Sequence, residues 1–71
     1  MKFNGAKLRA LRTEKGLSAD DLFVSLRNKG ARLNSTSICR IETGKQEPRY
    51  NLALAIAELF GVPVDTFNDN V

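Results

Sequence analysis

The stretch 33–44 constrains the fold most, because its residues mark both ends of a short helix. Asn34 is a favourable N-cap residue, since its side-chain oxygen can accept an otherwise unpaired amide of the first turn. Gly44 favours termination, since glycine enters the left-handed conformation past a helix end at no steric cost. Between them, Ile38 and Ile41 form an apolar side, and small polar residues with one arginine form another. The pattern predicts a helix that packs on a core with one side and offers its polar side to a partner.

The rest of the chain also reads as short helices separated by turns. Ser18 can cap a second helix, and Asp21 at its third position completes an acidic variant of the capping box. Pro48 disfavours helix in the residue before it, so we expect a loop there. No segment alternates as a strand would, and the sequence predicts one compact all-α domain of four to five helices over residues 1–71. The expected helices span about 5–15, 19–29, 35–43 and 50–60, with a short turn at 63–67.

Composition argues against several kinds of site. The chain has no histidine and a single cysteine, Cys39, so it lacks the usual residues for zinc binding, acid–base catalysis and an intrachain disulfide. We expect Cys39 to be a small, semi-buried filler and not a redox sensor. No apolar run approaches membrane-spanning length, and no signal-peptide pattern opens the chain. These features favour a cytoplasmic, non-enzymatic module with no catalytic residue, no metal and no cofactor.

Charge is unevenly distributed along the chain. Residues 1–16 carry five lysines or arginines and one glutamate, whereas residues 50–71 carry three acidic residues and no basic one. A basic front and an acidic back are typical of a protein that turns one face to a polyanion. The alternative, which charge leaves equally open, is that the excess lysine only improves solubility.

Several short motifs, taken in order, are distinctive. They are KLRALR at 7–12, KGLS at 15–18, SICRIETGK at 37–45 and LAIAELFGV at 54–62. Their order and spacing resemble the phage-repressor-like helix-turn-helix family, the Cro/repressor type also called the xenobiotic-response-element family. The resemblance covers about residues 5–67 and implies a lambda-repressor-like domain that binds double-stranded operator DNA. In such domains the second helix crosses the DNA backbone and the third lies in the major groove.

The resemblance implies base-reading roles on the third helix. Ser35 and Thr36, at its amino end, and Arg40, one turn later, would face base edges. Arginine is the strongest reader, because its fork can span O6 and N7 of guanine. The hydroxyl groups both donate and accept, so they are more permissive readers.

The resemblance also implies contacts to the DNA backbone. Asn34, Thr43 and the main-chain amide of Lys45 match positions that hold phosphates in the family. Arg49 matches a loop position from which an arginine can reach the narrow minor groove.

Arg12 and Glu42 match a family pair in which an arginine of the first helix bridges the glutamate at the end of the third. We interpret them as a partly buried ion pair that holds the third helix in place. The alternative is that Arg12 contacts DNA directly.

The chain departs from the family pattern before the third helix. Six residues separate Leu26 from Leu33, several more than usual, and Phe23 stands where the family commonly has alanine. A phenyl ring needs room, so we expect the second helix to run on by about a turn and the third to be displaced or re-angled. Lys29 and Arg32 in the longer turn are expected to add phosphate contacts. The alternative is a tolerated surface loop, since loop length costs little free energy.

These features predict a sequence-specific DNA-binding transcriptional regulator, most simply a repressor. A homodimer is expected on DNA, because one recognition helix covers only a half-site. The alternative is a protein-interaction module, such as an antitoxin or adaptor with the same fold, for which the apolar Phe23 and Val24 beside the long turn are the hint.

Overall fold

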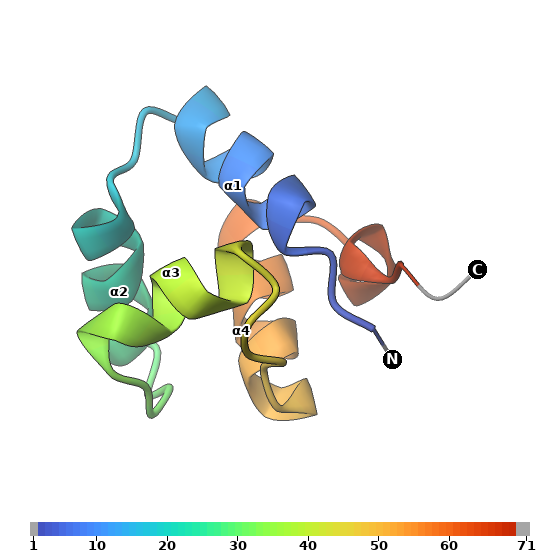
Figure 1. Ribbon diagram of the computed structural model, residues 1–71. Coiled ribbons are helices and arrows are strands. Elements are labelled where there is room, and N and C mark those ends of the chain that lie inside the picture. Colours follow the sequence, from blue (N-terminus) through green and yellow to red (C-terminus); the bar gives the residue numbers. More distant parts are fainter. Residues whose placement is uncertain (1, 70–71) are drawn as a thin grey trace.

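The computed structural model describes residues 2–69, which form four α-helices and one short 3-10 helix (Figure 1). The elements are α1 (Gly5–Glu14), α2 (Ala19–Asn28), α3 (Ser35–Glu42), α4 (Tyr50–Phe60) and η1 (Val64–Phe67). Within the described range the only β pairing is one isolated bridge. The expected all-α fold of four to five helices is confirmed.

Glycine-containing motifs end the helices, and α2 illustrates the geometry. Gly30 has a φ of +91°, a conformation that residues with a side chain avoid. Its N–H donates to the carbonyl of Arg27 at 2.9 Å, and the N–H of Ala31 donates to the carbonyl of Leu26 at 3.0 Å. These are the two hydrogen bonds of a Schellman motif, which pair the last carbonyls of a helix. Helices α1, α2 and α3 each end one residue earlier than expected. The last residue expected in each helix is instead its C-cap, namely Lys15, Lys29 and Thr43.

Apolar side chains from every helix meet in one core. Leu8 of α1 and Leu22 and Leu26 of α2 are fully buried. The alanines of α4 are part of the contact surface, because small side chains let neighbouring elements approach closely. The buried hydrophobic residues are Phe3, Leu8, Leu22, Leu26, Ile38, Ile41, Ala53, Ile56, Ala57, Phe60 and Phe67.

A contact between the two ends of the chain completes the fold, and the sequence patterns did not predict it. Phe3 forms the isolated antiparallel bridge with Asn68, and the N–H of Asn4 donates to the carbonyl of Phe67 at 2.7 Å. The rings of Phe3 and Phe67 stack with their centroids 5.0 Å apart. The N–H of Phe3 also donates to Oε2 of Glu47 at 2.9 Å. The amino-terminal segment therefore ties η1 to the loop before α4.

Helix α3 is held mainly by α1 and α2, whereas α4 packs on α2 and η1 (Figure 1). The first residue of α1, Gly5, lies directly against the end of α3. A Cβ atom added to Gly5 would overlap the carbonyl oxygen of Ile41 and would lie 2.9 Å from main-chain carbons of Glu42. The close approach of these two backbones therefore requires glycine at this position.

The start of α3 agrees with one sequence prediction, and its solvent side contradicts another. Asn34 occupies the predicted N-cap position and forms a capping box with Ser37. The N–H of Asn34 donates to Oγ of Ser37 at 3.2 Å, and the amide of Ser37 donates to the main-chain oxygen of Asn34 at 3.0 Å. Cys39 is exposed and not semi-buried, because it points away from the core that takes up Ile38 and Ile41.

The longer turn and Phe23 lie together, as the sequence suggested. Six residues, Lys29 to Asn34, connect α2 to α3. The ring of Phe23 is half-buried against the core, and the guanidinium carbon of Arg27 lies over it at 5.6 Å from the centroid. The outward displacement of α3 relative to other members of the family stays a prediction.

Candidate nucleic-acid interface

One side of α3 is free of the core and carries the residues predicted to read bases. Ser35, Thr36 and Arg40 are all exposed. Cys39 is exposed on the same side, one turn after Ser35. The opposite side is buried and consists of Ser37, Ile38 and Ile41. The helix therefore presents a continuous row of small polar side chains and one arginine to solvent.

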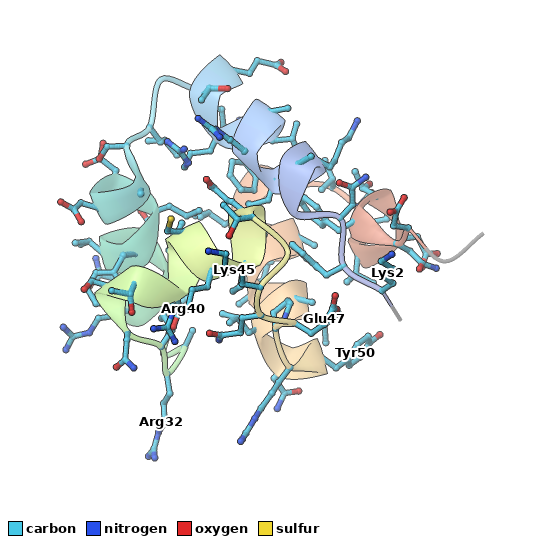
Figure 2. All side chains as sticks on the ribbon, in the orientation of Figure 1. Lys2, Arg32, Arg40, Lys45, Glu47 and Tyr50 are labelled. Atoms are coloured by element: carbon cyan, nitrogen blue, oxygen red, sulfur yellow. The ribbon has the colours of Figure 1, made fainter. Side chains whose placement is uncertain are left out.

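Basic side chains border this row at both ends of α3. Lys29 and Arg32 extend from the turn before the helix, and Lys45 and Arg49 extend from the loop after it; all four are exposed. Figure 2 shows Arg40 beside Lys45 in front of α3, with Arg32 reaching away from the body of the molecule. We call these four residues the basic rim. Together with Arg40, the basic rim gives this face a local excess of positive charge.

The three residues predicted to bind phosphates at the ends of α3 differ in whether their hydrogen-bond donors are already paired. Asn34 is exposed at the N-cap position of α3. The hydroxyl of Thr43 donates to the carbonyls of Cys39 and Arg40 at 2.9 and 3.3 Å, so it must rotate before it can donate to another group. The main-chain amide of Lys45 donates to the carbonyl of Arg40 at 2.9 Å and closes the helix end. A phosphate contact by this amide stays a prediction, and it would have to share the N–H with Arg40, whereas the side chain of Lys45 is exposed.

The structure brings Arg12 and Glu42 together at the end of α3. Nε of Arg12 donates to Oε2 of Glu42 at 2.7 Å, and Nη2 donates to Oε1 at 3.1 Å. Nη1 of Arg12 donates to the carbonyl of Leu17 at 2.8 Å, so the guanidinium also fixes the turn after α1. The two side chains are only 13% and 6% exposed. The hydrogen bond to Glu42 raises the pKa of Arg12 above its ordinary value, against the opposing effect of desolvation.

The chemistry of this face is that of hydrogen bonding and positive charge. Its groups are hydroxyls, an amide, guanidinium groups and ammonium groups, which suit the phosphates and base edges of a nucleic acid. Within residues 2–69 no group of histidine, cysteine, aspartate and glutamate side chains could hold a metal ion. None of the helices in that range has the length and apolar character needed to cross a membrane.

Cys39 is a member of this face that the motif comparison passed over. The signal was present in the helical period, since residues four apart share a side of a helix and Ser35 was already placed outward. Cys39 lies between Ile38, which favours the core, and Arg40, which favours solvent. The helical pattern alone therefore did not assign Cys39 to either side.

Comparison with known proteins identifies a family but no individual relative. No curated protein and no solved structure matches the chain. The sequence model of one family, described as a helix-turn-helix domain, matches residues 5–69, which include all four α-helices and η1. The match agrees with the resemblance to the Cro/repressor type, and its extent shows that the chain belongs to the helix-turn-helix domain family.

Proposed function

We propose that this protein is a sequence-specific DNA-binding transcriptional regulator, acting as a repressor in the cytoplasm, and that α3 enters the major groove. The observation that carries the proposal is the division of α3 into two sides. One side is buried and anchored through the Arg12–Glu42 pair, while the other exposes polar side chains next to the basic rim. A helix fixed from behind and polar in front is what major-groove reading requires.

Base reading is assigned to the exposed side of α3. Arg40 would form a bidentate pair with a guanine, which discriminates strongly against other bases. Ser35 and Thr36 would contact neighbouring base edges more permissively, since their hydroxyls can donate or accept.

Backbone contacts are assigned to the basic rim and to the two polar residues that cap α3. Lys29, Arg32 and Lys45 would neutralise phosphates, and Arg49 would reach the minor groove. The exposed position of Asn34 at the start of α3 supports its phosphate assignment. Thr43 takes part only if its hydroxyl turns away from the helix carbonyls.

The active form on DNA would be a homodimer on a two-fold symmetric site. A single eight-residue α3 covers too few base pairs for a unique operator. Two copies with their recognition helices one DNA turn apart would double the contacts and set the spacing of the half-sites.

Selection of duplexes from a random DNA pool tests the proposal, followed by binding of selected and scrambled duplexes over a salt series. We expect a symmetric consensus whose preference persists as salt rises, while total affinity falls because counterions are released. Equal affinity for selected and scrambled duplexes at every salt concentration would refute specific reading.

Single substitutions then separate the two kinds of contact. Arg40→Ala should relax preference at one base pair per half-site, by about 1–3 kcal/mol. Lys29→Ala should weaken binding to all duplexes alike and should lower the salt slope by about 1 per site. Lys15→Ala is the control, since it removes the same charge from an exposed residue that caps the end of α1, outside α3 and the basic rim. If Arg40→Ala weakens all duplexes equally, then Arg40 contacts only the backbone.

The protein-interaction alternative has less support. Phe23 is half-buried and covered by Arg27, so it offers little free apolar surface. Val24 is 52% exposed, but a single exposed valine is normal on a protein surface.

A further inference from the structure

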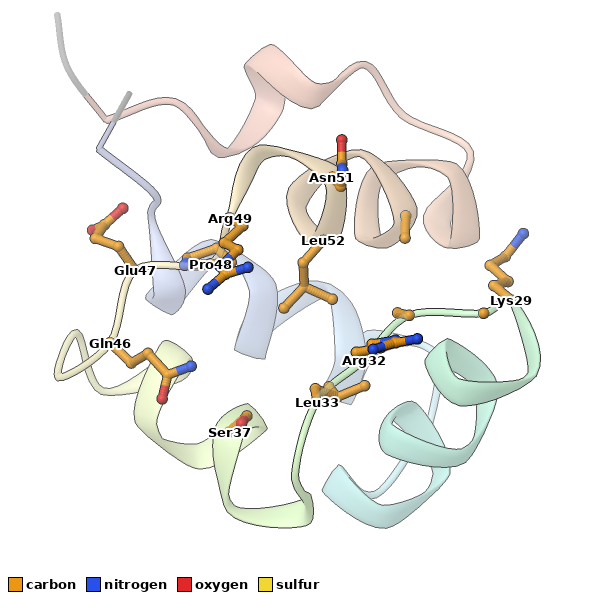
Figure 3. A pocket seen from close by; sticks show the side chains of 13 residues that line it. Lys29, Arg32, Leu33, Ser37, Gln46, Glu47, Pro48, Arg49, Asn51 and Leu52 are labelled. Atoms are coloured by element: carbon orange, nitrogen blue, oxygen red, sulfur yellow. The ribbon is translucent and has the colours of Figure 1, made fainter.

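A cleft opens beside the proposed interface, between α3 and α4 (Figure 3). The turn Lys29–Leu33 forms one wall, the loop Gln46–Arg49 forms the other, and α4 forms the floor. The volume of the cleft is about 570 Å³, within the range of small-molecule sites. It exists because α3 packs mainly on α1 and α2 while α4 packs on α2 and η1, so the segments that connect them do not close over the space.

The inner surface of the cleft is aliphatic. Leu33 and Leu52 lie at its centre in Figure 3, and both pack against the core. The remaining apolar lining consists of Ala31, Pro48 and Ala55, and no aromatic side chain contributes. Recognition of a nucleobase normally uses stacking on an aromatic ring or an arginine plane. No aromatic ring is available for such stacking, and the aliphatic floor can bury an alkyl group.

The edge of the cleft is basic. Arg32 and Arg49 lie on opposite sides of Leu52 in Figure 3, and Lys29 stands at one end of the same wall as Arg32. Glu47 is the single acidic residue of the lining, and its Oε2 already accepts the N–H of Phe3 at 2.9 Å. Two guanidinium groups around an aliphatic floor attract an anionic head group attached to an apolar body.

Ser37 adds one hydrogen-bond donor to the cleft from α3. It lines the cleft and is only 6% exposed. Its oxygen accepts the N–H of Asn34, while no acceptor within residues 2–69 takes its hydroxyl hydrogen. The hydroxyl can therefore donate to an oxygen atom of a bound head group without losing its role at the start of α3.

We propose that this cleft binds an aliphatic anion, a carboxylate or phosphate head on a short alkyl body. The head lies between Arg32 and Arg49, and the body lies on Leu33 and Leu52. Both arginines also belong to the basic rim, so the ligand and DNA compete for them. This competition rests on the proposed function, whereas binding of the ligand does not.

The binding step is tested on the full chain without DNA, by following amide signals in a nuclear magnetic resonance titration. The probes are octanoate, octyl phosphate, acetate and octyltrimethylammonium. We expect octanoate and octyl phosphate to shift the amides of Ala31, Leu33 and Leu52 in a saturable way, with acetate and the cation at least about tenfold weaker. Equal shifts with acetate, equal shifts with the cation, or no saturable shift with either octyl anion would overturn the proposal.

Substitutions identify the groups that hold the ligand. Arg32→Ala and Arg49→Ala should each weaken octanoate binding by about tenfold, because a charge-assisted hydrogen bond is lost. Ala31→Leu should block binding by filling the cleft from the wall formed by the turn, while leaving all charges in place. Arg9→Ala, an exposed arginine of α1 outside the cleft, is the matched control and should bind like the unaltered protein. If Arg9→Ala weakens binding as much as Arg32→Ala, the effect is one of net charge and the site is refuted; thermal unfolding confirms that each variant is folded.

The competition step uses the duplex found by selection. Octanoate at saturation should weaken DNA binding of the unaltered protein by about tenfold and should not change that of Ala31→Leu. If octanoate binds but DNA affinity is unchanged, the competition is wrong and the ligand site stands. If no duplex is selected at all, the proposed function fails while the titration without DNA still decides the ligand site.

Discussion

The two ends of α3 differ sharply in how they are held. At the carboxyl end, Ile41 is buried, Glu42 is clamped by Arg12, and the backbone touches Gly5. At the amino end, the residues that precede and start the helix are exposed, and the local cap is a 3.2 Å bond to Ser37. Both ends pack on the core, but only the carboxyl end also has an ion pair and a backbone contact to α1, whereas the amino end adds a local cap.

This difference indicates how the direction of α3 can be fixed while the turn before it can vary. The carboxyl end sets the direction of α3 relative to the core, so Arg40 is carried on a rigid support. The amino end depends on the six-residue turn, whose length and charge can change without disturbing the core. Four changes to the protein or its solvent test this contrast, and the loss of the ion pair should matter most.

Arg12→Ala should be the most damaging change. It leaves the Glu42 carboxylate, 6% exposed, without its partner and removes the bond to the Leu17 carbonyl. We expect a loss of about 3 kcal/mol in the free energy of unfolding, at the lower end for a buried pair because Arg12 is partly exposed. Chemical denaturation measures this loss, and Arg9→Ala is the control. A loss below about 0.5 kcal/mol, the size of a surface change, would show that the pair does not anchor α3.

Gly5→Ala tests the same end through backbone contact alone. The added methyl group meets the carbonyl of Ile41 and main-chain atoms of Glu42, which cannot move aside as a flexible side chain would. We expect about 2 kcal/mol of destabilisation from overpacking. Ala6→Ser changes a neighbouring exposed position and should be nearly neutral. If Gly5→Ala is stabilising, as helix propensity alone suggests, the tight contact is absent in solution.

Ser37→Ala tests the amino end. The change removes the acceptor for the Asn34 amide, and we expect a loss of about 1 kcal/mol, typical of a helix cap. Hydrogen exchange should speed up for amides in the first turn of α3 and stay unchanged near Ile41. Equal acceleration at both ends would show that the two ends are not held independently.

Acid provides the mildest test, because the starts of α2 and α3 use different chemistry. At α2 the amide of Asp21 donates to Oγ of Ser18 and the amide of Ser18 donates to Oδ2 of Asp21, both at 3.0 Å. The main-chain hydrogen bond from Ser18, and then its side-chain bond, lower the pKa of Asp21. Its contribution to stability is therefore complete above the ordinary pKa of aspartate and is lost as the pH falls through the lowered value.

The start of α3 has no such titration, since a serine hydroxyl stays neutral. Amides in the first turn of α2 should lose protection in acid before those of α3, as measured by hydrogen exchange corrected for the intrinsic rate. Asp21→Asn should remove this pH dependence. Loss of protection at α3 first would contradict the assignment of its cap to Ser37.

Much of the fold followed from local patterns, and the misses have identifiable causes. Ser18 with Asp21 marked the start of α2, and Gly30 and Gly44 marked helix ends, because such signals act within a few residues. Asn34 marked the start of α3, but the part of Ser37 was missed, because a serine there is equally compatible with an exposed surface. Phe3 was missed because its partners lie more than 40 residues away in the chain.

Helical period and capping chemistry determined the number, order and approximate bounds of the helices, and they placed Ser35, Thr36 and Arg40 on one side of α3. These features depend on neighbours along the chain, and a sequence records neighbours directly. Tertiary packing alone exposes Cys39 and brings Arg32 and Arg49 to the border of one cleft. Those outcomes depend on the distances between separate segments, which packing of the whole core sets and which no local pattern contains.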